Sequence, residues 1–66
     1  MSVAKTSEIT ASSSKSFEDA VRHGLSKMSK TVDNIEGAWV KEQKVVVKDG
    51  EVTAYRVTMK VTFLVK

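Results

Sequence analysis

Residues 55–65 alternate between apolar and polar side chains, and this pattern restricts the fold more than any other feature of the chain. The apolar positions are Tyr55, Val57, Met59, Val61, Phe63 and Val65, and the polar positions between them are Arg56, Thr58, Lys60 and Thr62. Successive side chains of a strand point to opposite faces. The pattern therefore predicts a long strand over residues 52–65, with one face buried and the other wet or used for another purpose.

A second strand is expected over residues 38–47, joined to the first by Asp49-Gly50. This dipeptide is typical of a two-residue hairpin, because both central positions of a type I′ turn have positive φ. A regular ladder from that turn pairs residues whose numbers sum to about 99, by the geometry of a two-residue loop. The predicted pairs are Val40 with Met59, Trp39 with Lys60, Lys41 with Thr58, and Gln43 with Arg56.

The first half of the chain predicts a strand and a helix. Residues 2–11 alternate in part, and Ser13 or Ser14 can cap a helix by accepting from a free backbone N–H of its first turn. Gly24 inside the helix indicates close approach by a strand or a neighbouring chain, since glycine is unfavourable there. Residues Asp33, Asn34 and Gly37 mark the helix exit. An apolar stripe predicts about five helical turns, and it consists of Phe17, Val21, Leu25, Met28, Val32 and Ile35.

These elements predict an α+β fold of the order β-α-β-β in a single domain, residues 1–66. The longest strand, 52–65, takes the centre of a three-stranded antiparallel sheet, and the helix lies on the face that carries Val57, Met59 and Val61. One helix on one sheet leaves the second sheet face without a protein layer. That face is covered either by water or by another copy of the chain.

The length of 66 residues limits the core that the chain can build alone. There is no cysteine, so no disulfide can support it, and one histidine, His23, does not make a zinc site. Self-association is the support that remains. The net charge of +3 is spread along the chain, which is typical of a solvated surface. No segment has the apolar length of a membrane helix or of a signal peptide, and we expect a cytoplasmic protein.

Trp39 is the residue whose role decides the functional interpretation. The predicted register places it on the face away from the helix, among Lys41, Gln43, Arg56 and Lys60, with Gly37 two residues earlier on the same face. One interpretation is burial in a subunit interface, where tryptophan is enriched. The other is a platform on which a planar ligand stacks while neighbouring donors hold its polar edge.

Other functional classes are less well supported by the residues. No nucleophile has a base at a suitable spacing, and His23 lies between charged residues on the helix, so the sequence does not predict an enzyme. A basic face with one aromatic ring resembles a single-stranded nucleic-acid platform, but such platforms use several rings. Cation binding at subunit contacts is a further alternative, with ligands from Glu8, Asp33, Glu36 and Glu42.

The chain as a whole resembles the dodecins, small flavin-binding proteins of bacteria and archaea that assemble as hollow shells of twelve chains. The resemblance covers nearly all of the chain, in the stretches VAKTSEITASSSKSFEDAV, KTVDNIEGAWVKEQ and DGEVTAYRVTMKVTF. It implies a strand, a helix and two more strands, with the sheet wrapped partly around the helix. It also implies a homododecamer.

The resemblance further implies a flavin ligand (riboflavin, FMN or FAD) stacked between tryptophans of adjacent chains, with a glutamine of the last strand bonded to the ring. When the Glu42-Gln43 pair is aligned with the family, the stacking tryptophan falls at Gly37. When the YxVTxKV stretch, residues 55–61, is aligned with the family, the ring-binding glutamine falls at Arg56. Trp39 lies two residues from the family position, roughly 6.5 Å along a strand. Arginine only donates hydrogen bonds, whereas a glutamine amide also accepts them.

Together these features predict a non-enzymatic, cytoplasmic homododecamer that stores or sequesters a small ligand. The expected ligand-binding residues are Trp39, Arg56, Gly37, Gln43 and Lys41. Flavin is the ligand implied by the resemblance. The alternatives are a flavin-independent structural or ion-binding shell and a single-stranded nucleic-acid binding module.

Overall fold

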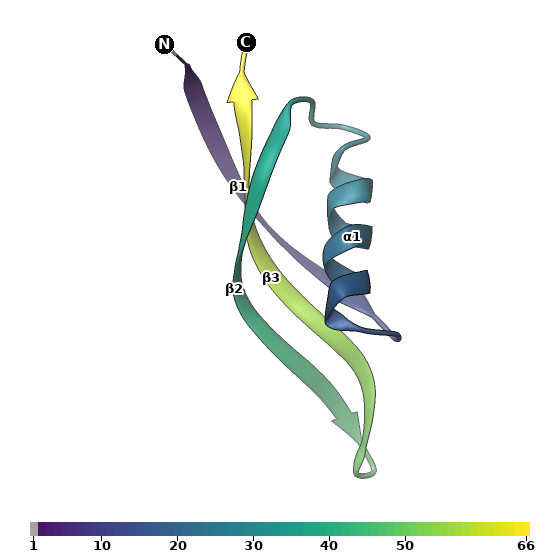
Figure 1. The fold of residues 1–66 in the computed structure, drawn as a ribbon. Helices are drawn as coiled ribbons and strands as arrows, with labels where there is room; N and C mark the ends of the chain where they lie inside the picture. Colours follow the sequence, from purple (N-terminus) through teal and green to yellow (C-terminus); the bar gives the residue numbers. More distant parts are fainter. Residues whose placement is uncertain (1) are drawn as a thin grey trace.

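The computed structural model describes residues 2–66 and confirms the α+β, β-α-β-β fold (Figure 1). Its elements are β1 (Val3–Ser13), α1 (Phe17–Met28), β2 (Ile35–Lys48) and β3 (Glu51–Val65). The sheet is antiparallel in the order β1-β3-β2, with β3 in the centre as predicted. Met1 of the expected domain lies outside the described residues. Within residues 2–66, no helix is both long and apolar enough to span a bilayer.

The β2–β3 hairpin turns at Asp49 and Gly50, whose φ values of 52° and 78° confirm the predicted positive-φ turn. The register then departs from a regular ladder at three places, and the last of them is at Glu36, which has no partner near the start of β2. Thr53 of β3 has no partner, and Lys41 of β2 has none, so the ladder shifts by one residue and later shifts back. Two bulges on opposite strands therefore compensate each other.

The predicted pairs outside the two bulges are confirmed, and those between them are wrong. Trp39 pairs with Lys60, and Val40 pairs with Met59, as expected. Between the bulges, however, Arg56 pairs with Lys44 and Thr58 with Glu42. Counting from the turn had paired Arg56 with Gln43 and Thr58 with Lys41, because the counted ladder contained no bulge.

The strand-to-helix connection corrects the predicted helix cap. Strand β1 continues to Ser13, and the N-cap of α1 is Ser16, whose Oγ accepts from the Asp19 N–H at 2.9 Å. The Ser13 hydroxyl has other partners: it accepts from the Lys15 N–H at 2.9 Å and donates to Asp19 Oδ2 at 2.6 Å. Ser13 thus stabilises the tight turn before the helix and is not its cap.

Helix α1 is 12 residues long and ends at Met28, so the expected length of about five turns is wrong. The backbone N–H groups of Thr31 and Val32 donate to the Met28 carbonyl at 3.1 and 3.0 Å and close the helix end. Asn34 then reverses the chain with a φ of 63°, and its carbonyl accepts from the Leu64 N–H at 3.0 Å. Ile35 continued the apolar stripe of the sequence because its side of β2 packs against the same core.

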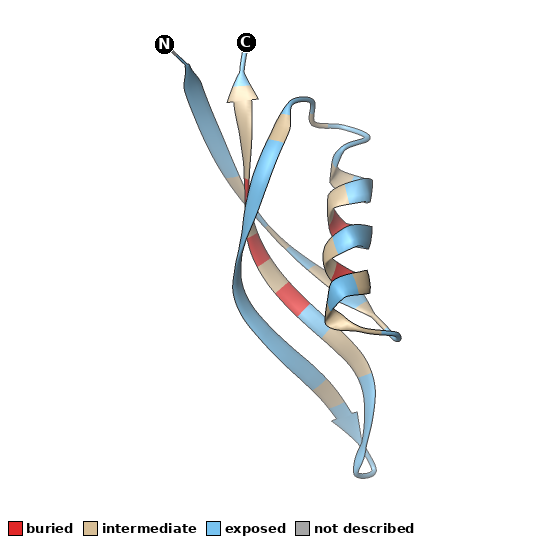
Figure 2. Cartoon of the chain, viewed as in Figure 1, coloured by how far each residue is buried: buried red, intermediate tan, exposed pale blue. Residues whose placement is uncertain are grey.

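The fully buried core of residues 2–66 consists of Ala20 from α1 and three alternating residues of β3: Val57, Met59 and Val61 (Figure 2). Ile9, Phe17 and Leu25 are partly buried around it. Burial of a valine or methionine side chain stabilises the fold by about 1.5–3 kcal/mol. A core of this size gives one chain little stability by itself.

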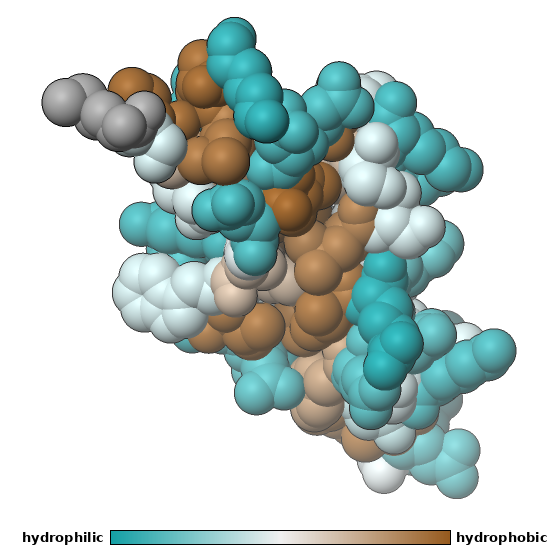
Figure 3. Space-filling model, turned by 45° about the horizontal axis from the view of Figure 1, so that its top comes forward, coloured by the Kyte–Doolittle hydropathy of each residue, from teal (hydrophilic) through white to brown (hydrophobic). Residues whose placement is uncertain are grey.

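Helix α1 packs on β1 and β3 and leaves the helix side of β2 largely uncovered. Val40 and Val45 share that side, because they pair with Met59 and Tyr55 of the core face. Near the turn, Val47 and Val52 pair with each other. These four residues, which we call the uncovered strip, are between 37% and 57% exposed. Hydrophobic surface forms a long band on the face shown in Figure 3. The uncovered strip therefore leaves apolar surface unprotected beside the helix.

Gly24 confirms the predicted close approach of a strand to the helix. A Cβ atom added there would lie 2.9 Å from Ala11 Cβ and 3.1 Å from Met59 Cε. The Ala11 Cβ is attached to the backbone of β1, so this contact cannot be relieved by a side-chain rotation.

Gly24→Ala is expected to destabilise the chain by about 1 kcal/mol, since the overpacking cost exceeds the gain in helix propensity. The free energy of unfolding, measured in urea at fixed chain concentration, tests this. Gly37→Ala is the matched control, because nothing lies within 4 Å of a Cβ added at Gly37. A Gly24→Ala protein as stable as the Gly37→Ala protein would contradict the close packing.

Candidate functional site

The sheet face opposite α1, which we call the outer face, carries polar side chains in regular rows. Each row contains one residue from each strand, because directly paired residues share a face. The row at the centre consists of Glu8, Lys60 and Trp39. The rows around it are Thr6, Thr62 and Gly37 on one side, and then Thr10, Thr58 and Glu42, followed by Ser12, Arg56 and Lys44, on the other.

Trp39 is 64% exposed and is surrounded by charged groups. The Lys60 ammonium lies 5.7 Å from the centroid of the indole ring, within the range of a cation–π interaction. Lys41, the bulged residue of β2, reaches across the central strand, and its Nζ lies 3.1 Å from Glu8 Oε1. The tryptophan ring thus stands at the β2 edge of a charged row. Its neighbours can orient a ligand that stacks on it.

A second cluster on the outer face surrounds Arg56. The Arg56 Nε donates to Ser12 Oγ at 3.0 Å, and Lys44 lies directly opposite on β2. A hollow of about 460 Å³ adjoins this pair, lined by Thr10, Glu42, Gln43, Lys44, Arg56 and Thr58. Like charges directly opposite in a sheet repel each other. This cluster can therefore accept an anionic group.

The structure divides the five predicted site residues between two places. Trp39 and Lys41 lie together, and Gly37 is in the next row. Arg56 is four residues from Lys60 along β3, roughly 13 Å by strand rise, so it cannot contact the same small ring as Trp39 without a longer ligand. Gln43 pairs with Val57 of the core face, so the expectation that it shares a face with Trp39 is wrong, although it still borders the hollow.

Two residues of these clusters were missed from the sequence, Glu8 as a partner of Lys41 and Lys44 as a partner of Arg56. Antiparallel pairing of the first strand with the last could have located Glu8. Lys44 could not be found, because its position opposite Arg56 depends on the bulges. Within residues 2–66, no three metal-ligating side chains come together.

Comparisons with known proteins point to one family. A family profile described as Dodecin matches residues 3–66. The dodecin from Streptomyces davaonensis is 28% identical and superposes with a TM-score of 0.94 over 98% of this chain and 96% of that chain. An arginine-to-alanine mutant of the Thermus thermophilus dodecin is 26% identical, with a TM-score of 0.94 over 100% and 98% of the two chains. No curated protein matches this chain significantly.

A third similar structure carries information about ions. It is the calcium dodecin of Mycobacterium tuberculosis, a calcium-chelating antigen with a novel calcium-binding site. It is 31% identical to this chain, with a TM-score of 0.84 over 97% of this chain and 91% of that chain.

The polar surroundings of Trp39 favour the platform over the interface, and this can be measured. Trp39 is the only tryptophan, so its fluorescence reports on one side chain. We expect acrylamide to quench it nearly as well in the native protein at high concentration as in the dilute protein, because charged neighbours disfavour a dry contact. N-acetyltryptophanamide serves as the fully exposed reference. Strong protection in the native protein without ligand would instead place Trp39 in an interface.

Proposed function

The chain belongs to the dodecin family, and from that premise we propose that it forms a cytoplasmic homododecamer, a hollow shell that binds and stores small planar ligands without catalysis. The observation that carries this proposal is the uncovered strip beside α1. Val40, Val45, Val47 and Val52 stay exposed in a single chain, and the buried apolar core of residues 2–66 contains four side chains. Burial of this strip against other copies supplies the stability that the core of one chain lacks.

The ligand platform of the proposal is Trp39 with Lys60. Dodecins are flavin-binding proteins, and the resemblance described above placed their stacking tryptophan at Gly37 and their ring-binding glutamine at Arg56. Here the ring has moved two residues along β2, and a cation lies over it at 5.7 Å. A flavin bound to this face has a different arrangement from that of the family. A ligand that stacks on the same ring face displaces the Lys60 ammonium from the ring. The displaced ammonium stays beside the ligand and favours a planar molecule with a negative charge.

An ion-binding shell is the second candidate, favoured by the similarity to the calcium dodecin of Mycobacterium tuberculosis. Within residues 2–66 of one chain, the carboxylates do not gather in threes. A calcium ion takes six to eight oxygen ligands. In this alternative, we propose that carboxylates from more than one chain meet at a subunit contact and that carbonyl oxygens or water complete the site. Calcium binding measured on the intact assembly, and lost on dissociation, is the result expected from this alternative.

Val45→Asp is expected to dissociate the assembly, because it places a charge in the uncovered strip, where burial without a partner is costly. The concentration at which the oligomer dissociates should rise at least about tenfold, equivalent to about 1.4 kcal/mol. Analytical ultracentrifugation or native mass spectrometry measures this change. Thr6→Asp, on the outer face, is the matched control. Unchanged mass for both variants, or a wild-type protein that stays monomeric at micromolar concentration, would refute the proposed assembly.

Trp39→Ala is expected to abolish ligand stacking without changing the native mass. Stacking on an aromatic ring contributes about 1–3 kcal/mol, so affinity should fall at least about fivefold. Titration of riboflavin and FMN, followed by quenching of the flavin fluorescence, gives the affinity, and Trp39→Phe retains part of it. If the wild-type protein quenches neither flavin, the proposed ligand class is wrong. If Trp39→Ala and wild type quench equally, the ligand binds elsewhere.

A further inference from the structure

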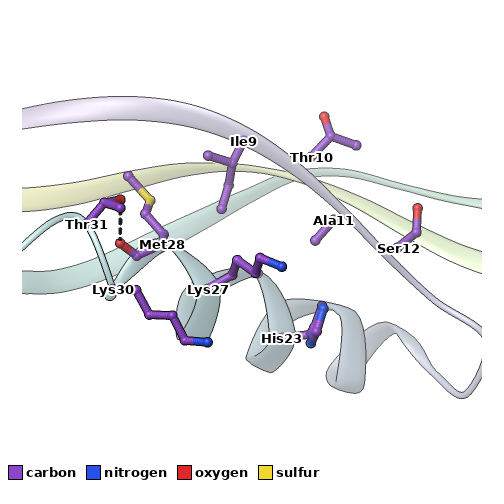
Figure 4. Close-up of a pocket in the computed structure, with 10 residues that line it drawn as sticks. Ile9, Thr10, Ala11, Ser12, His23, Lys27, Met28, Lys30 and Thr31 are labelled. Carbon is purple, nitrogen blue, oxygen red and sulfur yellow. Dashed lines mark hydrogen bonds between the residues drawn. The ribbon is translucent and has the colours of Figure 1, made fainter.

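A hollow lies between β1 and α1, on the edge of the sheet opposite β2 (Figure 4). It has a volume of about 680 Å³. Ile9 and Ala11 point from β1 toward the helix and form an apolar floor with Gly24 and Met28, whereas Thr10 and Ser12 point away. His23, Lys27 and Lys30 form the rim. We call this hollow the basic groove.

The rim of the basic groove carries positive charge without a counter-charge. The ion pairs among residues 2–66 are Glu18–Arg22 and Glu8–Lys41, and neither involves the rim. No acidic residue lines the groove. Lys27 lies in the last turn of α1, where the helix dipole favours a cation, but this does not account for Lys30. An apolar floor with an unpaired basic rim fits a segment that is apolar along one side and acidic at its end.

The tip of the β2–β3 hairpin is such a segment. The Phe17 ring at the start of α1 contacts the Tyr55 ring, with centroids 5.2 Å apart, so the hairpin beyond Tyr55 extends past the helix (Figure 1). We call residues 45–54 the hairpin arm. Along one side it carries three residues of the uncovered strip: Val45, Val47 and Val52. Two carboxylates lie at its tip, Asp49 and Glu51, with Lys48 opposite Glu51.

We propose that the hairpin arm of one chain lies in the basic groove of the next chain, with the valines on the apolar floor and Asp49 and Glu51 beside Lys27 and Lys30. This inference rests on the proposed self-association and names the surfaces that meet. The arm extends past the start of α1, whereas Lys27 and Lys30 lie at the other end of the helix, so a chain cannot fill its own groove (Figure 1). The contact is therefore head-to-tail, and it closes into a ring when the rotation between chains permits.

Paired cysteines test the geometry, because the chain has no cysteine of its own. The double variant Val52→Cys/Thr31→Cys keeps Lys27 and Lys30 and places one cysteine in the groove. Treated with a short bis-maleimide in the native state, it should give covalent oligomers on a denaturing gel. The double variant Val52→Cys/Lys5→Cys is the control, because Lys5 pairs with Phe63 near the opposite end of β3. Equal cross-linking in the two variants, or none in the first, would overturn the proposed contact.

Charge exchange tests the recognition. Lys27→Glu with Lys30→Glu should raise the dissociation concentration of the assembly at least tenfold, and so should Glu51→Lys with Asp49→Asn, which keeps a residue that tolerates positive φ at the turn. The combination of both pairs should restore assembly to within threefold of wild type. Lys5→Glu is the control for a charge reversal outside the groove and the arm, because Lys5 pairs with Phe63 near the other end of β3.

The outcomes separate this inference from the proposed function. An assembly that ignores all these charge changes, or that responds equally to Lys5→Glu, overturns the arm-in-groove contact while leaving the shell in place. Loss of assembly in each pair without restoration in the combination also overturns it. A wild-type protein that never assembles refutes the proposed function itself. Circular dichroism of each variant establishes that the chain is folded.

Discussion

The twelve residues of α1 span about 18 Å, whereas the fifteen residues of β3 extend about 50 Å. One short helix therefore cannot cover a sheet of this length, and the 51 Å long axis of the molecule reflects the strands alone. The helix also covers only part of the width of the sheet, because α1 packs on β1 and β3 and not on β2. The small core, the exposed valines and the free hairpin arm all follow from this mismatch between helix and sheet.

The amino-acid pattern predicted the elements of the fold and most of their faces, because those depend on local periodicity. The alternation of residues 55–65 predicted the central strand, and Asp49-Gly50 predicted the turn. Gly24 predicted a close approach by a strand or a neighbouring chain, and the strand is β1. Periodicity failed where two elements shared one core. Val32 and Ile35 continued the helical spacing, although hydrogen bonds to Met28 and the left-handed Asn34 end the helix earlier.

The candidate site was predictable in part, for a related reason. The pairing of Trp39 with Lys60 follows from counting residues back from the turn. The bulges at Thr53 and Lys41 lie between the turn and this pair, and their register shifts cancel. The pairing of Arg56 with Lys44 lies between the bulges and could not be counted in this way. An unpaired Thr53 or Lys41 has no distinctive side-chain chemistry, since a bulge depends on how the twisted strands fit together. The single site expected from the sequence is therefore two separate places, the row that contains Trp39 and the hollow beside Arg56.

The bulges at Lys41 and Thr53 also affect the direction in which the hairpin meets a neighbouring chain. A bulge bends its strand and increases the local right-handed twist, and the bulges at Lys41 and Thr53 lie on the two strands of the hairpin. The direction in which the ribbon leaves the body of the chain is thus determined inside the polypeptide, before any neighbour is present. In the proposed shell, the curvature of the hairpin therefore contributes to the angle at which neighbouring chains meet. Straightening that ribbon would change this angle.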